Sequence, residues 1–340
     1  MKFDDIELWP VKCRQSCASC ALTCERKWFL QYRMGVRLRG GEFKEAADLG
    51  TIYHRLQLEG VGGEEEVKKW LREKQVALVA KVEAGEDLSG NLARTANKLF
   101  ELYNIAEAMF HIFVEKFPQP EWFKTIGKET KHEFMLDGVL LSGTIDKLLL
   151  DTHSGNVWIR DHKSTGRALA SLFAGAAWGL QGRIYRLLAK DYLHTQGDDV
   201  LALRGFILDG ITRPGIKLCK TDMANAKKWN CTAEEAYLRR VKEWYRDAEG
   251  QRDQKLMRSL AVMFTESPEP AELVNVLALF RNLAIMGPNP AHYDRDVTRR
   301  GCFAWERECI YKDLCDTDPG QWDSLFEKKY FIKPYEETEE

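Results

Sequence analysis

Hydrophobic and polar positions follow two different periods along this chain of 340 residues. Over 10–34 the apolar and cysteine positions recur every three or four residues, which predicts a helix, and helical patterns resume over 45–60 and continue towards residue 117. Between 129 and 163 the period shortens, and apolar runs are separated by Asp-Gly and by THSGN. We therefore expect a helical first third and then a meander of three strands.

The rest of the chain mixes both kinds of element. A helix is predicted over about 169–193, and then a hairpin in which LALRGFILDGI and GIKLCKTDM are joined through an Arg-Pro-Gly turn. From 221 to 285 the pattern is helical again. Without a repeat or a linker, the sequence predicts one α/β (α+β) domain over 1–340, with a helical part over 10–128, an α/β core over 129–220 and a second helical part over 221–340.

Composition narrows the class of protein. A hydrophobic content of 44% in 340 residues is enough for a large buried core. No apolar run approaches the ~20 residues that span a bilayer, so we expect a soluble, cytoplasmic protein with no membrane partner. The net charge of -2 does not exclude a polyanionic partner, because the N-terminal part is basic. Its basic residues include Lys12, Arg14, Arg26, Lys27, Arg33, Arg37, Arg39 and Lys44.

Charged residues end two of the predicted strands. Asp161 and Lys163 are two positions apart, so their side chains share one face of a strand. Asp146 precedes Asp161 by fifteen residues, a length that lets a tight turn bring the two carboxylates side by side on antiparallel strands. Metal-assisted phosphodiester hydrolysis requires this combination, because carboxylates hold Mg²⁺ or Mn²⁺ and an ammonium group orients water or neutralises charge.

The same pattern has a simpler interpretation. Asp146 and Lys163 alone would form a surface ion pair at the end of a hairpin, since such short patterns arise by chance. Two further features favour a site. Gln181 and Tyr185 lie one turn apart on the next predicted helix, and Gln181 is a polar residue in a small and apolar stretch. His54 lies in the helical segment LGTIYHRLQLEG.

These pieces, in this order, resemble the PD-(D/E)XK nuclease superfamily and specifically its RecB-like exonuclease branch. The matching segments are Gly50 to His54, Gly143 to Asp146, Asp161 to Lys163 and Gln181 to Tyr185. The resemblance covers about residues 20–190 and resumes near the C-terminal cysteines. It implies a restriction-endonuclease-like core, with a mixed central sheet flanked by helices and large helical additions at both ends.

The resemblance also implies a role for each matched residue. It assigns metal binding to His54, Asp146, Asp161 and the main-chain carbonyl of His162, assistance of the nucleophilic water to Lys163, and contact with DNA to Gln181 and Tyr185. Asp161 stands where much of the superfamily has Glu. Glu133 stands where relatives often carry an acidic residue in the first core strand, and we interpret it as structural.

Nine cysteines in a chain of this kind indicate metal or cluster ligation rather than disulfides. Cys302, Cys309 and Cys315 are one thiolate short of a four-cysteine site. The arrangement is similar to that of RecB-like and CRISPR-associated nucleases in which one N-terminal and three C-terminal cysteines hold a 4Fe-4S cluster. This resemblance implies Cys24 as the fourth ligand, and Zn²⁺ in the same site is the alternative.

The remaining cysteines have two interpretations. Cys13, Cys17 and Cys20 spell CxxxCxxC, the signature of radical SAM enzymes, but their surroundings are predicted to be helical. On a straight helix Cys13 and Cys24 would be ~16 Å apart, too far to grip one cluster. We therefore expect Cys13, Cys17 and Cys20 to pack on a helix face. Cys219 and Cys231 are also expected to be packing residues.

The predicted function is a metal-dependent DNA nuclease. An exonuclease that acts on single strands or duplex ends is favoured over an endonuclease. The N-terminal arginines would follow phosphates, and Trp28 or Trp178 would stack bases. No Walker A motif is present, so a helicase, single-strand-annealing or CRISPR-adaptation partner is expected if unwinding is needed, in recombination, repair, phage replication or CRISPR adaptation. The alternatives are an inactive nucleic-acid-binding subunit, a radical SAM enzyme and a restriction-type endonuclease.

Overall fold

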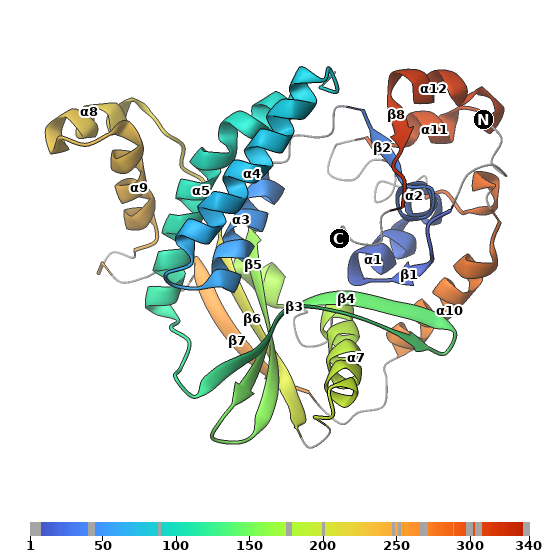
Figure 1. Ribbon diagram of the computed structural model, residues 1–340, viewed down its shortest axis with the longest axis horizontal. Helices are drawn as coiled ribbons and strands as arrows, with labels where there is room; N and C mark the ends of the chain where they lie inside the picture. Colours follow the sequence, from blue (N-terminus) through green and yellow to red (C-terminus); the bar gives the residue numbers. More distant parts are fainter. Residues whose placement is uncertain are drawn as a thin grey trace.

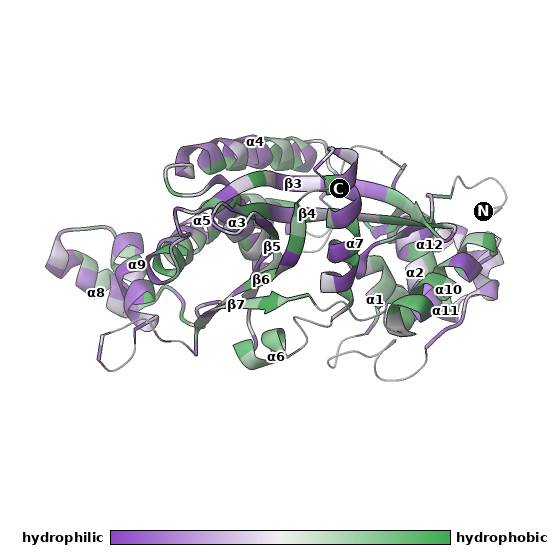
Figure 2. Cartoon of the chain, turned by 90° about the horizontal axis from the view of Figure 1, so that it is seen from below, coloured by the Kyte–Doolittle hydropathy of each residue, from purple (hydrophilic) through white to green (hydrophobic). Residues whose placement is uncertain are grey.

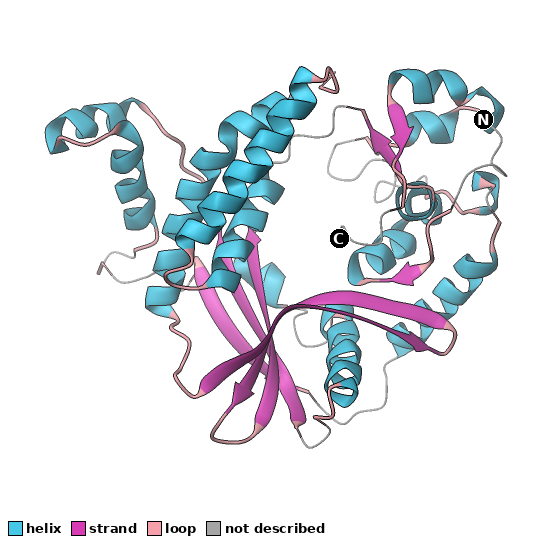
Figure 3. Cartoon of the chain, viewed as in Figure 1, coloured by secondary structure: helices cyan, strands magenta, loops and turns pink. Residues whose placement is uncertain are grey.

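A mixed β-sheet forms the centre of the chain, and helices flank it (Figure 1; Figure 3). Its long strands are β3 (Phe123–Leu136), β4 (Val139–Asp151), β5 (Asn156–Thr165), β6 (Ala202–Thr212) and β7 (Met257–Met263). The computed structural model describes residues 8–39, 45–87, 90–174, 179–198, 201–246, 249–250, 253, 255–264, 271–287, 289–296, 302 and 308–335.

The predicted three-stranded meander is confirmed. β3, β4 and β5 pair in antiparallel register, with His132 opposite Gly143 and Lys147 opposite Arg160. The Asp-Gly signal forms the first turn, where Asp137 and Gly138 have φ values of 49° and 78°. Positive φ at both central residues twists a two-residue hairpin in the direction that its strands need.

Beyond the meander the order of strands depends on long-range pairing. β6 runs parallel to β5, and β7 pairs antiparallel with β6. The short β1 (Lys12–Cys13) pairs parallel with the start of β4. Because β5 and β6 are parallel, their carboxyl ends meet at one edge of the sheet, where Lys163 lies opposite Gly210.

Three long helices from the first third of the chain build one of the two cores. They are α3 (Glu45–Glu59), α4 (Glu64–Glu83) and α5 (Asn91–Lys116). Residues such as Leu99, Tyr103 and Phe110 recur at helical spacing on α5 and are fully buried. The other core lies between the sheet, α7 (Leu180–Thr195), α10 (Ala271–Ile285) and the chain ends.

The N- and C-terminal parts lie side by side, as Figure 1 shows. β2 (Val36–Leu38) pairs antiparallel with β8 (Tyr330–Ile332), and the Phe29 and Tyr293 rings stack with centroids 4.1 Å apart. The elements around them are α1 (Gln15–Thr23), α2 (Glu25–Trp28), the π-helical turn Phe29–Arg33, α11 (Lys312–Asp316) and α12 (Asp323–Lys328). Short 3-10 turns occupy Pro290–His292 and Pro319–Gln321.

The helix predicted over 10–34 is wrong in detail. It begins as β1 and breaks at Cys24, whose backbone is extended and whose thiol accepts a hydrogen bond from the Lys27 main-chain N–H. The helix predicted over 169–193 is divided as well, into α6 (Leu169–Phe173) and α7.

Two further predictions are wrong because pairing across the sheet overrides local pattern. The segment GIKLCKTDM does not form a hairpin with β6. It leads instead into α8 (Lys220–Trp229), which turns back as α9 (Ala233–Trp244). The region over 221–285 is not wholly helical, since β7 interrupts it and completes the sheet beside β6.

Figure 2 shows α8 and α9 as a mainly hydrophilic hairpin at one end of the molecule, far from the helices that carry most of the cysteines. Among the described helices, none combines the length and the apolar character needed to cross a bilayer.

Candidate active site

Three elements bring the predicted site residues together: α3, β4 and β5. His54 of α3 places Nε2 at 2.7 Å from Oδ2 of Asp146 on β4. The same carboxylate oxygen accepts a hydrogen bond of 3.0 Å from the main-chain N–H of His162 on β5. Asp146 is therefore fixed from both neighbouring elements, and it is 5% exposed.

In the second carboxylate, that of Asp161, only one of the two oxygens has hydrogen-bond partners among the described residues. Lys163 Nζ lies 2.9 Å from Oδ1 of Asp161, as expected for residues that share a strand face. Gln181 of α7 donates to the same oxygen through Nε2 at 3.0 Å. The other oxygen, Oδ2, is buried and has no hydrogen-bond partner among the described residues. Asp161 has no exposed surface.

Close packing of α7 on β4 holds Gln181 and Tyr185 at this position. A Cβ atom at Gly143 would lie 2.6 Å from Cδ1 of Leu188 and 3.6 Å from Cε1 of Tyr185. The position therefore excludes a side chain if the helix is to approach the strand. Burial raises the pKa of Tyr185 to about 12, and the charge of Asp161 acts in the same direction, so Tyr185 remains neutral beside the carboxylates.

The two carboxylates have opposite pKa shifts. Burial acts to raise the pKa of Asp146, but the hydrogen bond and charge of His54 outweigh it, so the pKa is lowered. Burial raises the pKa of Asp161 to about 6, and the charge of Asp146 adds to this effect despite the nearby Lys163. The site therefore stabilises the negative charge of Asp161 less than that of Asp146.

The two basic groups of the site, His54 and Lys163, both have raised pKa values. Burial acts to lower the pKa of His54, but its contact with Asp146 outweighs this and the pKa is raised. For Lys163 the charges of Asp161 and Asp146 likewise outweigh burial, and the pKa lies above its ordinary value. At neutral pH Lys163 is therefore an ammonium donor rather than a proton acceptor.

The two carboxylates are donors of the chemical type that a hard divalent cation takes. In the described ranges, no group of three or more His, Cys, Asp or Glu side chains is arranged so that it could hold a metal ion. His54 and Asp146 contact each other directly, so a cation would replace that contact. The unpartnered Oδ2 of Asp161 is an oxygen ligand of the kind that Mg²⁺ and Mn²⁺ take, and a cation there would stabilise the charge that burial disfavours.

The side chain of His162 faces the opposite side of β5. Its Nδ1 lies 3.1 Å from Oδ2 of Asp209 on β6, and Arg160 Nε donates to that oxygen at 2.6 Å. Only the main chain of His162 therefore contacts the site, because its side chain points to the other face of β5. On the same opposite side Lys147 donates to the main-chain carbonyl of Gln57 near the end of α3.

Sequence reasoning missed Asp209, Arg160 and Lys147. Asp209 is a single acidic residue within the apolar run GFILDGI, and this isolation was its only signal. Its importance depends on the parallel pairing that sets it opposite His162. Neither the pairing nor its partner can be found from local periodicity.

The four cysteines predicted to hold a cluster lie in one region of the fold. Burial raises the pKa of Cys315 to about 11, and the charges of Cys309 and Cys24 contribute. Burial also raises the pKa of Cys309, where Cys24 and Cys302 act in the same direction. The Cys309 main-chain N–H donates to the Cys302 carbonyl at 2.8 Å. Here too, no group of described side chains is arranged so that it could hold a metal ion.

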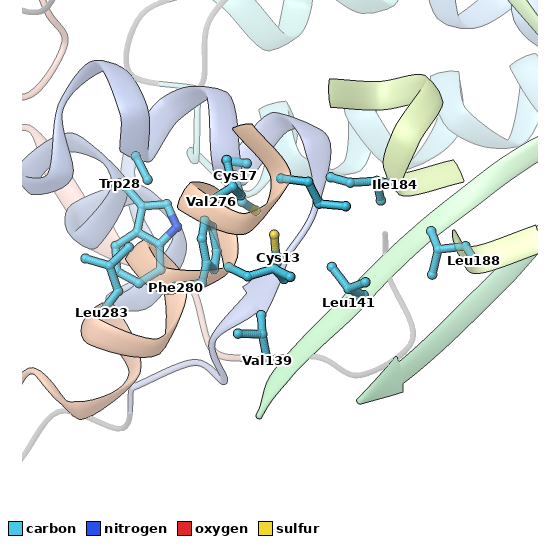
Figure 4. Packing of buried hydrophobic residues seen from close by; sticks show 14 of the residues in the cluster. Cys13, Cys17, Trp28, Val139, Leu141, Ile184, Leu188, Val276, Phe280 and Leu283 are labelled. Carbon is cyan, nitrogen blue, oxygen red and sulfur yellow. The ribbon is translucent and has the colours of Figure 1, made fainter. Parts of the chain in front are cut away.

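The other cysteines follow their predictions in part. Figure 4 shows Cys13 and Cys17 packed with Val276, Phe280 and Leu141. Cys13 has no exposed surface and lies in the apolar core, as expected for a packing residue. Cys219 is exposed at the N-cap of α8, so its prediction as a packing residue is wrong.

The predicted phosphate contacts of the N-terminal arginines are not supported by their placement. Arg26, Arg37 and Arg39 donate to the main-chain carbonyls of Tyr293, Gln31 and Phe326, and Arg33 donates to that of Trp9. Trp28 is 1% exposed, so base stacking on it is also excluded. Trp178 and Lys44 lie outside the described residues.

Glu133 lies away from the site, as its structural interpretation requires. It accepts hydrogen bonds from Lys12 and Ser142, both at 2.8 Å.

The mixed central sheet flanked by helices is consistent with a restriction-endonuclease-like fold. The sequence model of the PD-(D/E)XK nuclease superfamily matches residues 15–316, so the chain belongs to that superfamily. The match spans the helical parts as well as the sheet. A search of the curated proteins gives no match.

Proposed function

We propose that this chain is a metal-dependent deoxyribonuclease, and specifically an exonuclease that hydrolyses single-stranded DNA or duplex ends. The observation that carries the proposal is the buried, unpartnered Oδ2 of Asp161 beside Lys163, opposite the pair of His54 and Asp146. A carboxylate that is costly to ionise and lacks a donor is a position where a cation stabilises the protein and is held in place.

Asp146, Asp161 and His54 would hold the cation, with the main-chain carbonyl of His162 as a fourth ligand. Bound Mg²⁺ or Mn²⁺ would polarise the phosphate and acidify a water molecule. Lys163, kept charged by both carboxylates, orients that water and neutralises charge developing on the phosphate. Gln181 fixes Asp161 through Oδ1, and Tyr185 extends the same helix face towards the substrate strand.

The decisive experiment compares wild type with Lys163→Ala on end-labelled linear DNA and on circular DNA, with Mg²⁺ or Mn²⁺. Lys190→Ala is the matched control, because Lys190 is an exposed lysine on α7. We expect the wild type and the control to shorten linear strands from an end, and Lys163→Ala to be inactive. Degradation that persists in Lys163→Ala would refute the site, and cutting of circular duplex would indicate an endonuclease.

The same assay separates the active enzyme from an inactive nucleic-acid-binding subunit. A wild type that binds DNA but cleaves neither substrate with either metal would favour the subunit. Blunt duplex, tailed duplex and single strands should be compared, because dependence on a tail would indicate a helicase or CRISPR-adaptation partner that supplies single strands.

We also infer that Cys24, Cys302, Cys309 and Cys315 hold a 4Fe-4S cluster. Their shared neighbourhood supports this, since charges on Cys24 and Cys309 act on the thiol of Cys315. Protein purified without oxygen should be brown and contain iron and sulfide. Cys315→Ser should lose both, whereas Cys219→Ser should keep them. Colourless protein with one zinc ion would favour the zinc alternative.

A further inference from the structure

The helical hairpin formed by α8 and α9 leaves the sheet at the same edge as the candidate active site. Arg213 follows the last residue of β6, and its main-chain N–H donates to the carbonyl of Thr165 at 2.7 Å. Thr165 is only two residues beyond Lys163 on β5. A nucleic-acid strand that passes Lys163 along this edge would therefore meet Arg213 and then the hairpin.

Internal contacts make the hairpin a defined support rather than a loose loop. Arg240 of α9 donates to Asp222 of α8 at 2.8 and 2.7 Å and to the Lys217 carbonyl at 2.7 Å. Tyr237 donates to the Ile216 carbonyl at 2.9 Å. These bonds fix the segment between the sheet and α8, and they use the one acidic residue of α8 internally.

The outer surface of the hairpin has an unbalanced charge. Residues 213–229 contain five basic residues and one acidic residue, Asp222, in a chain whose net charge is -2. Lys217, Lys220, Lys227 and Lys228 are all exposed. Their ammonium groups have no hydrogen bond or ion pair with any other described residue. This sets them apart from the N-terminal arginines, whose guanidinium groups bind main-chain carbonyls.

Arg213 connects this surface to the active-site edge. A Cβ atom at Gly166 would lie 2.6 Å from Nη2 of Arg213, so the glycine leaves room for the guanidinium. Its Nε is buried without a hydrogen-bond partner among the described residues. A buried donor of this kind is costly unless an acceptor binds it, and a phosphate oxygen is such an acceptor.

An aromatic ring completes the surface at the end of α8. Trp229 is 39% exposed, and the Arg239 guanidinium lies 5.3 Å from the centroid of its ring. Exposed tryptophan beside lysine is the usual means by which proteins hold single-stranded nucleic acid, because bases stack on the ring and phosphates bind the cations. An acidic protein segment would use the lysines but would have less need of the ring.

We propose that Arg213, Lys217, Lys220, Lys227, Lys228 and Trp229 form a strand-holding arm that binds single-stranded DNA next to the active site. This deepens the proposed function and rests on it. The arm accounts for the exposed lysines, for the buried donor of Arg213 and for the exposed ring within residues 213–229. α8 spans ~15 Å, enough for several phosphates of one strand.

The test measures binding of a fluorescein-labelled 30-nucleotide oligothymidine by anisotropy, in EDTA so that cleavage is blocked. The arm variant carries Lys217→Gln, Lys220→Gln, Lys227→Gln and Lys228→Gln. Its matched control carries the same change at Lys69, Lys81, Lys190 and Lys328, which are also exposed. Circular dichroism verifies that both variants are folded.

We expect Kd of the arm variant to rise at least tenfold, and the slope of log K against log salt to fall by roughly 2–3, since each phosphate contact on a single strand contributes ~0.7. The control should keep the wild-type slope. Trp229→Ala should weaken binding about tenfold, and Trp229→Phe should retain most of the affinity because its ring still stacks.

An arm variant with the wild-type Kd and slope would overturn the inference, and it would favour another polyanion, such as an acidic protein segment, as the ligand. Equal losses in arm and control variants would overturn it too, since binding would then depend on overall charge. The proposed function fails separately, if Lys163→Ala degrades DNA like the wild type. Cleavage lost in Lys163→Ala together with unchanged binding by the arm variant would refute the arm alone.

Discussion

The two faces of β5 carry charges that alternate along four consecutive residues. Asp161 and Lys163 face the candidate active site, and Arg160 and His162 face Asp209 on the other side. Asp161 and Asp209 both have no exposed surface. Yet burial raises the pKa of Asp161 to about 6, whereas contacts with His162 and Arg160 outweigh burial at Asp209 and lower its pKa to about 2.

The difference shows that burial alone does not decide the state of a carboxylate. Asp209 has cationic or neutral donors around it and no acidic neighbour among the groups that shift its pKa. Asp161 has a second carboxylate, Asp146, nearby, and the charge of Asp146 raises the pKa of Asp161 further. Protein groups alone stabilise the charge of Asp209, whereas those around Asp161 leave its charge disfavoured.

Asp161→Asn should have the largest effect on activity. The amide cannot supply the charge that holds a cation, so cleavage should fall about 10³-fold, or ~4 kcal/mol in transition-state stabilisation. Single-turnover rates with saturating Mg²⁺ measure this. Activity that stays within a few-fold of wild type would remove Asp161 from the proposed ligands.

Asp209→Ala should have the largest effect on stability. It leaves Arg160 and His162 buried without their carboxylate, and breaking a buried ion pair in this way costs ~3–5 kcal/mol. Urea unfolding monitored by circular dichroism gives the value. Asp161→Asn in the same experiment is the comparison, because it should not destabilise the metal-free protein; similar losses in both variants would contradict the contrast between the two faces.

The pH dependence of stability should have opposite signs on the two faces. Asp161 has a raised folded pKa, so in EDTA its contribution is present below about pH 4 and is lost as the pH rises through about 6, by ~1–3 kcal/mol. Asp209 has a lowered pKa, so its contribution is present above about pH 4 and is lost as the pH falls towards 2.

The Asp161 part is isolated by subtracting the unfolding free energy of Asp161→Asn at each pH between 4 and 7. The difference should shrink when Mg²⁺ is added, because the cation stabilises the charged carboxylate. A difference that does not vary with pH would contradict the raised pKa.

Lys147→Met tests a buried cation on the face of the sheet that carries Asp209. Burial lowers the pKa of Lys147 to about 8, so the folded protein loses this proton before the unfolded chain does. The wild type should therefore gain stability relative to Lys147→Met as the pH rises from about 8 to 10, by ~1–3 kcal/mol. Thermal unfolding of the two proteins in parallel buffers measures the difference, and Lys190→Met serves as an exposed control.

The sequence was sufficient to identify the charged residues on one face of β5 as candidates, but not those on the other face. Asp161 and Lys163 fall in a short pattern with local consequences, since alternation on a strand places them together. The partner of Arg160 lies 49 residues away and becomes visible only when β6 pairs parallel with β5. The failure at the segment after β6 has the same origin, because its Arg-Pro-Gly signal marks the end of a strand rather than a turn between two strands.

The cysteine region teaches the same lesson at longer range. The distance argument assumed a straight helix from Cys13 to Cys24, and the break at Cys24 removes that assumption. The separation of roles survives for a different reason, since Cys13 is sealed in the core beside Phe280 and not merely distant along a helix axis.

The pairing of β2 with β8 can form only after the ribosome has made the chain between them. Arg39, just beyond β2, donates to the carbonyl of Phe326, 287 residues later. At ~5–20 residues per second the ribosome needs ~15–60 s to make the intervening chain. During that time the apolar residues around Trp28 have no partner from the C-terminal part, so a nascent chain is exposed to chaperones and proteases until its last strand emerges.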